Sequence, residues 1–216
     1  MNLIILGLPA AGKGTQAKKI SQEYNLTHIS TGDILRKAAT EKSLFGKEIK
    51  KYLDAGELVP DEMAIGIVKE KLLKEDLDAG VVFDGFPRTP KQAEALTEIL
   101  AELGKKLDLA IYIKADEAEI IRRISGRRVC RDCGASYHLD YNPPEKERVC
   151  DRCGGKLIQR SDDQEETVKK RIRLHSKLLA QLISYYEEKA ILKTVLSKGG
   201  IEEVFARIKE IIEVNL

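Results

Sequence analysis

Short apolar runs alternate with amphipathic segments along most of the chain. The apolar runs cover residues 2–6, 27–30, 81–84, 108–113 and about 191–196. Segments with apolar residues at helical spacing lie between them, at residues 16–24, 61–75, 90–103 and 117–125. This alternation of strands and helices predicts a parallel sheet covered by helices on both faces, with ligands bound at the carboxyl ends of the strands. We therefore expect an α/β fold with five parallel strands.

Two further helices are predicted towards the end of the chain. The last one carries a single apolar stripe, formed by Ile201, Val204, Phe205, Ile208, Ile211 and Ile212. The helix before it repeats apolar residues on one face, at Val168, Ile172, Leu178, Leu179 and Leu182. Asp162 stands where it can cap the start of that earlier helix.

Two stretches interrupt the alternation. Residues 30–59 hold two short helical segments with no strand between them, and residues 127–160 hold the cysteines, two prolines and a Gly-Gly pair without a long periodic run. We interpret both stretches as insertions into one α/β domain. The core of that domain is then formed by residues 1–29, 60–126 and 161–216.

A glycine-rich loop follows the first predicted strand. Residues 7–15 read Gly-Leu-Pro-Ala-Ala-Gly-Lys-Gly-Thr and lead into a helical pattern. Such a loop points its backbone N–H groups inward around phosphates, and the helix that begins near Lys13 adds the positive end of its dipole. The Lys13 ammonium reaches the outer phosphates, and the hydroxyl that binds magnesium comes here from Thr15, one residue later than usual. In this strand–loop–helix context the motif predicts a nucleoside triphosphate site.

Composition and charge narrow the classes of function. The net charge is +2 with 33% charged residues, which indicates neither a polybasic nucleic-acid-binding surface nor disorder. No apolar run approaches the ~20 residues of a membrane helix. A signal peptide has basic residues before its apolar segment, and none precedes the apolar patch at residues 3–8. We expect a cytoplasmic protein with no nucleic-acid or membrane partner. A monomer is expected too, because no apolar stripe is left over.

The four cysteines have the spacing of a zinc ribbon. Two residues separate Cys130 from Cys133 and Cys150 from Cys153, and 16 residues lie between the two pairs. Disulfides are the alternative, but nothing else in the sequence indicates an oxidising compartment. Structural Zn²⁺ is favoured, although iron also binds to four thiolates.

A polar cluster follows the third predicted strand. Asp84 leaves this buried strand near the glycine loop, where a carboxylate can hold Mg²⁺ through water molecules. Arg88 is then placed to bind a second phosphate with its planar guanidinium group. A polar turn with a surface salt bridge is the alternative, and the neighbouring glycine loop makes it the weaker one.

Further polar residues begin the first insertion. Thr31 is expected to cap a helix at the end of the second strand, with Arg36 about one turn later. Capping can be the whole role of Ser30 and Asp33.

Arginines gather around the cysteine insertion. Arg123 and Arg127 share one helix face if that helix extends so far, while Arg160 and Arg171 lie beyond the insertion. Together they could converge on a transferred phosphoryl group. The alternative is a set of solvated charges paired with the acidic residues between positions 162 and 166.

No residue stands out as a general base. His28 is expected in a strand, His138 in the cysteine insertion and His175 on a helix, each in a structural role. A phosphate acceptor has a second pKa of about 6 and needs no base near neutral pH. Positioning and charge compensation are then sufficient for phosphoryl transfer.

Several motifs occur in order along the chain, at residues 7–15, 30–33 (Ser-Thr-Gly-Asp), 84–88 (Asp-Gly-Phe-Pro-Arg) with Gln92, 126–128 (Gly-Arg-Arg) and 160–163 (Arg-Ser-Asp-Asp). Together they resemble the adenylate kinase family over essentially all 216 residues, in the long-lid form with a zinc-binding lid. The resemblance implies a P-loop NTPase-type fold with a five-stranded parallel sheet flanked by helices. Residues 30–59 would be the helical insertion that binds the nucleoside monophosphate, and residues 127–160 the lid. The implied reaction is reversible phosphoryl transfer from Mg-ATP to AMP, giving two ADP.

The resemblance also implies a role for each motif residue. The catalytic set is Lys13, Arg88, Arg127, Arg160 and Arg171. The ATP-binding set is Ala10, Ala11, Gly12, Lys13, Gly14, Thr15, Arg123, Arg127, Ser136, Tyr137 and Gly199. The AMP-binding set, in which Gln92 reads the adenine, is Thr31, Arg36, Glu57, Leu58, Val59, Gly85, Phe86, Pro87, Arg88, Gln92, Arg160 and Arg171. The metal-binding set is Cys130, Cys133, Cys150 and Cys153 for Zn²⁺, and Asp84 for Mg²⁺, which it binds through water.

One position departs from the family pattern. The family loop commonly has glycine after the proline, where this chain has Ala10. If the position requires a positive φ, Ala10 costs about 1–2 kcal/mol of strain.

Three alternatives remain at this point. The first is a kinase of the same scaffold that acts on GMP, UMP or CMP. The second is a nucleic-acid-binding zinc ribbon beside a P-loop domain. The third is a GTPase, which the absence of an Asn-Lys-x-Asp motif disfavours.

Overall fold

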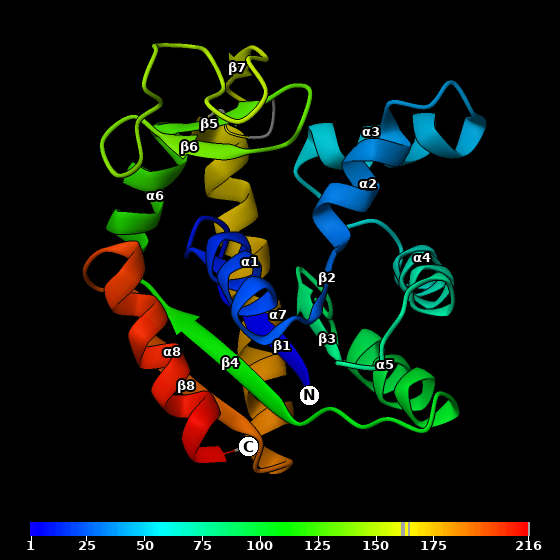
Figure 1. Ribbon diagram of the computed structural model, residues 1–216. Helices are drawn as coiled ribbons and strands as arrows, with labels where there is room; N and C mark the ends of the chain where they lie inside the picture. Colours follow the sequence, from blue (N-terminus) through cyan, green and yellow to red (C-terminus); the bar gives the residue numbers. More distant parts are fainter. Residues whose placement is uncertain (161–162, 164, 216) are drawn as a thin grey trace.

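A five-stranded parallel sheet forms the centre of the computed structural model, which describes residues 1–160, 163 and 165–215. The strand order is β2-β3-β1-β4-β8, and every neighbouring pair is parallel (Figure 1). The bounds are β1 (Asn2–Leu6), β2 (Thr27–Ser30), β3 (Val81–Asp84), β4 (Leu109–Lys114) and β8 (Leu192–Leu196). The predicted α/β fold with five parallel strands is confirmed.

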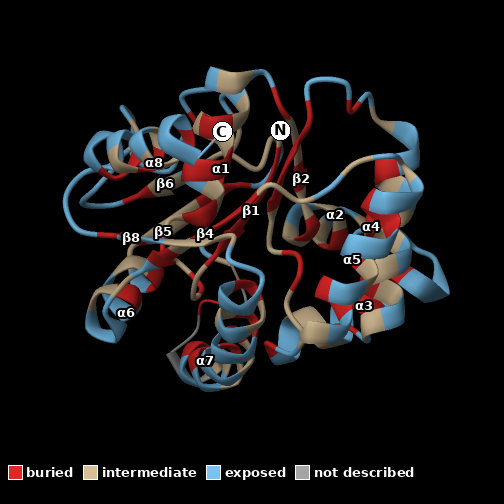
Figure 2. Cartoon of the chain, turned by 90° about the horizontal axis from the view of Figure 1, so that it is seen from below, coloured by how far each residue is buried: buried red, intermediate tan, exposed pale blue. Residues whose placement is uncertain are grey.

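Helices cover both faces of this sheet, as Figure 2 shows by their buried inner and exposed outer sides. They are α1 (Lys13–Tyr24), α4 (Asp61–Lys74), α5 (Pro90–Glu102), α7 (Glu165–Glu188) and α8 (Ile201–Asn215). Helix α6 (Glu117–Ser125) packs instead against the start of α7 and the glycine-rich loop. Residues alternate along β1: Ile4 packs in a core cluster with α4, α5 and α7, and Ile5 in another with α1 and α8. None of the described helices is long and apolar enough to cross a membrane.

The two interrupting stretches have their own small structures. Residues 30–59 contain α2 (Thr31–Ala39) and α3 (Leu44–Ala55). Residues 127–160 contain an antiparallel sheet of order β6-β5-β7, with β5 (Arg127–Cys130), β6 (Ser136–His138) and β7 (Leu157–Ile158). Both lie beyond the carboxyl ends of the central strands in Figure 1.

The predicted element boundaries hold to within one or two residues, and the first helix begins at Lys13, as the glycine-rich loop predicts, three residues before its periodic segment at 16–24. The predicted helix cap at Thr31 is wrong. Ser30 is the cap, and its hydroxyl accepts a hydrogen bond from the Asp33 N–H at 3.4 Å. The reason is that β2 runs through Ser30, which pairs with Asp84, so Thr31 is already the first helical residue.

The expectation that Arg123 and Arg127 share a helix face is also wrong. Helix α6 ends at Ser125, and Arg127 begins β5, where it pairs with His138. A Cβ at Gly126 would lie 2.4 Å from the His138 ring, so the turn between helix and strand requires glycine there. The cap predicted at Asp162 lies outside the described residues.

Candidate functional site

The glycine-rich loop joins β1 to α1 at the carboxyl edge of the sheet. A Cβ at Gly7 would lie 2.8 Å from the carbonyl oxygen of Ile113, so only glycine fits beside β4. Gly12 stands directly before α1 with φ 102°, and Ala10 has φ 60°. The left-handed conformation considered for Ala10 is therefore present, at a cost of about 1–2 kcal/mol.

Lys13 is buried at the start of α1, where its ammonium group donates a hydrogen bond to the Leu8 carbonyl oxygen at 2.8 Å. Burial is the main cause that lowers the pKa of Lys13 to about 7, and the nearby Arg88 adds to it. Asp84 acts in the opposite direction. Arg127 and Arg171 also lower this pKa, so several cations predicted to act together surround one point. Such a cationic centre favours the binding of an anion.

Asp84 ends β3 beside the first turn of α1. A Cβ on Gly14 would lie 3.0 Å from its Oδ2 atom, which places the carboxylate against the first turn of α1, directly after the glycine-rich loop. A carboxylate next to a phosphate-binding loop is a suitable outer ligand for Mg²⁺, which retains most of its water. The position of Asp84 therefore fits its predicted role.

Arg88 lies in the turn between β3 and α5. Its Nε–H donates to the Gly85 carbonyl oxygen at 2.8 Å, and its Nη1–H donates to Nδ1 of His175 at 3.2 Å. Its backbone N–H donates to the Gln92 Oε1 atom at 2.7 Å. Burial lowers the pKa of Arg88 to about 10, which still leaves the guanidinium charged near neutral pH.

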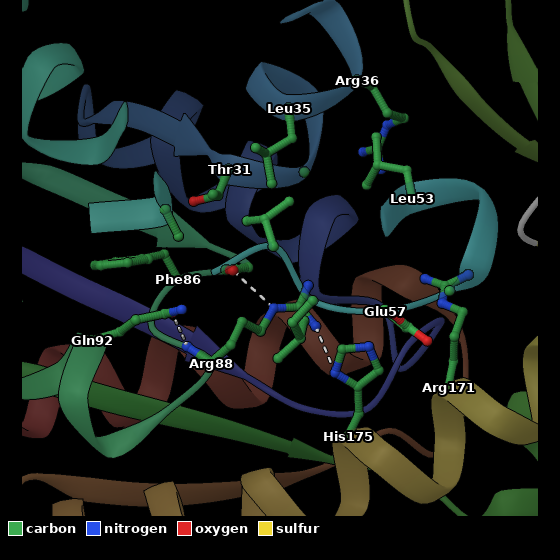
Figure 3. Close-up of a pocket in the computed structure, with 16 residues that line it drawn as sticks. Thr31, Leu35, Arg36, Leu53, Glu57, Phe86, Arg88, Gln92, Arg171 and His175 are labelled. Atoms are coloured by element: carbon green, nitrogen blue, oxygen red, sulfur yellow. Dashed lines mark hydrogen bonds between the residues drawn. The ribbon is translucent and has the colours of Figure 1, made fainter. Parts of the chain in front are cut away.

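A pocket opens beside Arg88, between the central sheet and the first insertion (Figure 3). Its lining consists of Thr31, Gly32, Leu35, Arg36, Leu53, Gly56, Glu57, Leu58, Val59, Ala64, Gly85, Phe86, Arg88, Gln92, Arg171 and His175. All residues of the predicted AMP set are among them except Pro87 and Arg160. Pro87 lines an adjoining smaller cavity together with Lys13.

Two polar side chains in this pocket differ in how they are satisfied. The Thr31 Oγ1 atom is buried with no hydrogen-bond partner within the described residues, so it is available to a ligand. Both polar atoms of the Gln92 amide already make hydrogen bonds. Its Oε1 accepts from the backbone N–H of Arg88, and its Nε2 donates to Asp61 Oδ1 at 2.7 Å. One N–H of the Gln92 amide is left to contact a base.

Arg123 connects the loop to the end of β8. Its Nη1–H donates to the Ser197 hydroxyl at 2.6 Å, and its Nε–H donates to Glu119 Oε1 at 2.7 Å. The Ser197 hydroxyl in turn donates to the Ala11 carbonyl oxygen at 3.0 Å. Ser197 was not predicted from the sequence, because only the parallel pairing of β4 and β8 brings it to the loop. Gly199 follows shortly after, with φ 93°.

Asp163 draws two of the predicted arginines together. Its carboxylate is fully buried and accepts hydrogen bonds from Nε (2.9 Å) and Nη2 of Arg127. Arg171 Nη1 lies 3.6 Å from the Asp163 Oδ1 atom. The arginines are thus paired with an acidic residue, as in the alternative considered from the sequence, but in a buried position. Arg160 lowers the pKa of Asp33, which places its charge towards α2.

The four cysteines lie together at the tips of the small sheet. Their Sγ atoms all lie within 4.8 Å of one another, with 3.5 Å between Cys130 and Cys153 and 3.6 Å between Cys133 and Cys150. No disulfide joins them. Four sulfur donors at these separations fit a tetrahedral site with Zn–S distances of about 2.3 Å.

Two of the residues predicted to contact the ATP adenosine, Ser136 and Tyr137, lie on β6. Ser136 is exposed, and the Tyr137 hydroxyl lies 3.4 Å from Sγ of Cys150. This hydrogen bond is the main cause that lowers the pKa of Cys150 to about 6, towards the thiolate form that binds metals. The Tyr137 hydroxyl therefore contacts Cys150, and the aromatic ring is the part of this side chain that a nucleotide would contact.

The histidines occupy unlike positions. His28 is in β2 and His138 in β6, as predicted, and Nδ1 of His138 accepts hydrogen bonds from the Asp140 and Tyr141 N–H groups at 3.0 and 3.2 Å. His175 is on α7, as predicted, but it lines the pocket. The signal for this was its position four residues after Arg171, which puts both side chains on one helix face.

Comparisons with known proteins give a consistent result. A family model described as Adenylate kinase matches residues 5–191. The chain is 53% identical over 213 residues to an adenylate kinase of Archaeoglobus fulgidus, covering 99% of this chain and 98% of that protein. It is 52% identical over 212 residues to one of Bacillus licheniformis and 53% identical over 212 residues to one of Clostridium botulinum, with 98% of each chain covered.

Proposed function

Since the chain belongs to the adenylate kinase family, we propose that it transfers the terminal phosphoryl group of Mg-ATP reversibly to AMP, giving two ADP. Family membership establishes phosphoryl transfer involving a nucleoside monophosphate. The observation that carries the choice of AMP is the pocket, whose lining combines the Thr31 hydroxyl, unpartnered within the described residues, and the Gln92 amide with the cations of Arg36, Arg88 and Arg171. This arrangement suits a planar base at one end and a phosphate at the other.

We propose that the acceptor phosphate binds at Arg88. Its guanidinium is anchored by Gly85 and His175, and it retains N–H groups for bidentate contact with phosphate oxygens. Arg36 would add charge from α2, while the apolar side chains of Leu35 and Leu53 would contact the base and ribose. The other proposed acceptor contacts are those predicted from the sequence, including Arg160, which is not among the pocket-lining residues.

The donor triphosphate is proposed to bind to the glycine-rich loop. Backbone N–H groups of residues 10–15 and the positive end of α1 would hold its phosphates, with Lys13 at the transferred group. Arg123 and Arg127 would approach from the other side, and Ser136, Tyr137 and the backbone at Gly199 would contact the adenosine. Asp84 and Thr15 would hold Mg²⁺ through water, and the ion would neutralise charge at the transferred phosphoryl group.

The reaction needs no general base in this proposal. The acceptor phosphate is largely ionised near neutral pH because its second pKa is about 6. The chain's task is to bring two anionic groups together, and Lys13, Arg88, Arg127, Arg160 and Arg171 are proposed to offset their repulsion. Water must also be excluded, since it would otherwise accept the phosphoryl group.

We propose that the two insertions provide this exclusion. Residues 30–59 would close over the monophosphate and residues 127–160 over the triphosphate, against a core of residues 1–29, 60–126 and 161–216. Zn²⁺ at the four cysteines would stiffen the lid without taking part in the chemistry, because four thiolates leave no open coordination position. A monomer in the cytoplasm is part of the proposal, and one chain carries every proposed contact.

The test is an assay of Mg-ATP with AMP, GMP, CMP and UMP in turn, with the diphosphates quantified. We expect ADP formation with AMP far above that with the other three acceptors, and Lys13→Met should abolish it. A preference for another monophosphate would retain the reaction class and overturn the assignment of Thr31 and Gln92. Loss of ATP without any acceptor would contradict the proposal altogether.

A further inference from the structure

The anchoring of Arg88 is the starting point. A guanidinium group carries five N–H donors and no acceptor. Two of these donors are used within the protein, by the Gly85 carbonyl oxygen at 2.8 Å and by the His175 ring at 3.2 Å. One contact comes from the turn after β3 and the other from α7. They fix the plane of the guanidinium and leave its other donors for a ligand.

The protonation of His175 follows from this contact. Because Arg88 can only donate, Nδ1 of His175 must accept, and the single ring proton is on Nε2. Burial lowers the pKa of His175 to about 2, and the cations of Arg88, Arg171 and Lys13 contribute to this shift. The ring is therefore neutral at every pH at which the protein is expected to work.

We propose that His175 is a positioning residue for the acceptor phosphate, which holds the Arg88 guanidinium in place through Nδ1 and leaves its positive charge undiminished. This inference rests on the proposed function, in which Arg88 binds the phosphate of AMP. His175 would act through Arg88 and through the orientation of its planar fork.

A neutral acceptor suits this position better than the more common carboxylate. Aspartate or glutamate beside Arg88 would fix it equally well, but would offset its charge and repel the incoming phosphate. The contrast is visible nearby, where the buried Asp163 carboxylate holds Arg127 and Arg171. Arg88 thus differs from these two arginines, because the hydrogen-bond partners of its guanidinium within the described residues are both uncharged, and the Asp84 carboxylate acts on its pKa only through its nearby charge.

The position of His175 in the pocket supports this role over one of simple packing. The ring lines the pocket and projects from α7 into the space between Arg88 and Arg171 (Figure 3). It is only 7% exposed, so the ring has little freedom to turn away from Arg88. At position 175, a side chain of similar size without a hydrogen-bond acceptor would fill the same space, but the Nη1 side of the Arg88 guanidinium would lose its partner.

Two substitutions separate these roles. His175→Asn retains an acceptor, since the Asn Oδ1 atom occupies nearly the place of Nδ1, whereas His175→Leu retains bulk alone. Ser176→Ala, at an exposed position one residue later on α7, is the matched control. The measurements are steady-state kinetics with varied AMP and with varied ATP, and calorimetric binding of AMP to the enzyme without ATP.

We expect His175→Leu to lower kcat/KM for AMP by about tenfold or more, as the loss of a hydrogen bond to a charged group implies. Its KM for ATP should be unchanged. His175→Asn should recover most of the loss, and Ser176→Ala should match the parent protein. In an Arg88→Ala background, His175→Leu should cause no further loss, because the two residues act as a unit.

Three outcomes would overturn the inference: His175→Leu binding AMP as tightly as the parent, His175→Asn being as impaired as His175→Leu, or full additivity with Arg88→Ala. Global unfolding of the Leu variant would show itself as an equal loss for ATP, and the Asn variant then decides by itself. Failure of the proposed function is separate, since it would appear as absence of AMP-dependent ADP formation in the parent protein.

Discussion

At the scale of single residues, Lys13 shows how the site is prepared for an anion. Its ammonium group is buried beside cations, and its pKa is lowered to about 7. Between pH 7 and the ordinary value of 10.5, the unfolded chain binds more protons at this residue than the folded chain. The contribution of Lys13 to the free energy of unfolding therefore rises with pH across that window. Below pH 7 the protein holds a buried charge that the Leu8 carbonyl oxygen and Asp84 compensate only in part.

Binding of ATP should reverse this shift, because phosphate oxygens next to the ammonium group favour its charged form. At pH 8 the free protein holds Lys13 mostly neutral and the complex holds it charged. We predict the uptake of close to one proton on ATP binding, measured by calorimetric titration in two buffers of different ionisation enthalpy. Lys13→Met should remove the uptake. A parent protein that binds ATP at pH 8 without taking up a proton would contradict the prediction.

The backbone of Ala10 is a second feature of this scale. A glycine at φ 60° avoids the steric cost borne by alanine, although it loses more entropy on folding. Ala10→Gly should therefore raise the free energy of unfolding by up to about 1 kcal/mol in urea denaturation. Ala190, with φ 57° and outside the predicted site, is a matched position where glycine should give a similar gain. Only Ala10→Gly should also change the KM for ATP, and a loss of stability in both variants would show that the strain is absent.

At the scale of elements, the sequence predicts strands and helices well but their junctions poorly. The five strands and the helical insertion follow from apolar periodicity, which depends on burial along each element. The junctions at Ser30 and Gly126 depend on partners that are distant in the chain. Ser30 pairs with Asp84, and Gly126 lies against His138. For this reason, sequence reasoning placed the cap one residue late and left open whether the helix continues past Ser125 to Arg127.

The residues of the candidate site also divide into those that the sequence identifies and those that it does not. Lys13, Asp84 and the cysteines belong to local motifs with strict spacing, so the sequence identifies them. His175 and Ser197 have no motif, and they reach the site only because α7 crosses the sheet and β8 pairs with β4. Their roles could be recognised only once the elements were assembled.

The reassigned cap can be tested by two neighbouring substitutions. Ser30→Ala removes the hydroxyl that accepts from the Asp33 N–H, and should lower the free energy of unfolding by about 1 kcal/mol. Thr31→Val removes a buried hydroxyl that has no partner within the described residues, and should not destabilise the free protein. It should, however, weaken the binding of AMP. If Thr31→Val proved the more destabilising of the two in chemical denaturation, Thr31 would be the cap after all.

At the scale of the whole molecule, stability is unevenly distributed. Two large apolar clusters lie on the two faces of the central sheet, with side chains from most of the long helices. The small sheet has a separate cluster whose buried members are Cys130, Cys150 and Leu157. The apolar area buried in this cluster is too small to keep residues 127–160 folded. The reason is that burial must offset about 1–2 kcal/mol of backbone entropy for each ordered residue. In the proposed function, metal binding at the four cysteines would supply much of the stability that residues 127–160 lack.

Removal of this metal should therefore unfold the lid before the core. We predict that a thiol-site chelator lowers the temperature at which residues 127–160 lose hydrogen-exchange protection, while the central strands keep theirs. Turnover at low temperature, assayed after Mg²⁺ is restored, should fall much less, because no cysteine touches the reacting groups in the proposed mechanism. Cys153→Ser should behave like the chelated protein without any chelator. If low-temperature turnover fell in step with lid protection, the metal would be part of the catalytic arrangement itself.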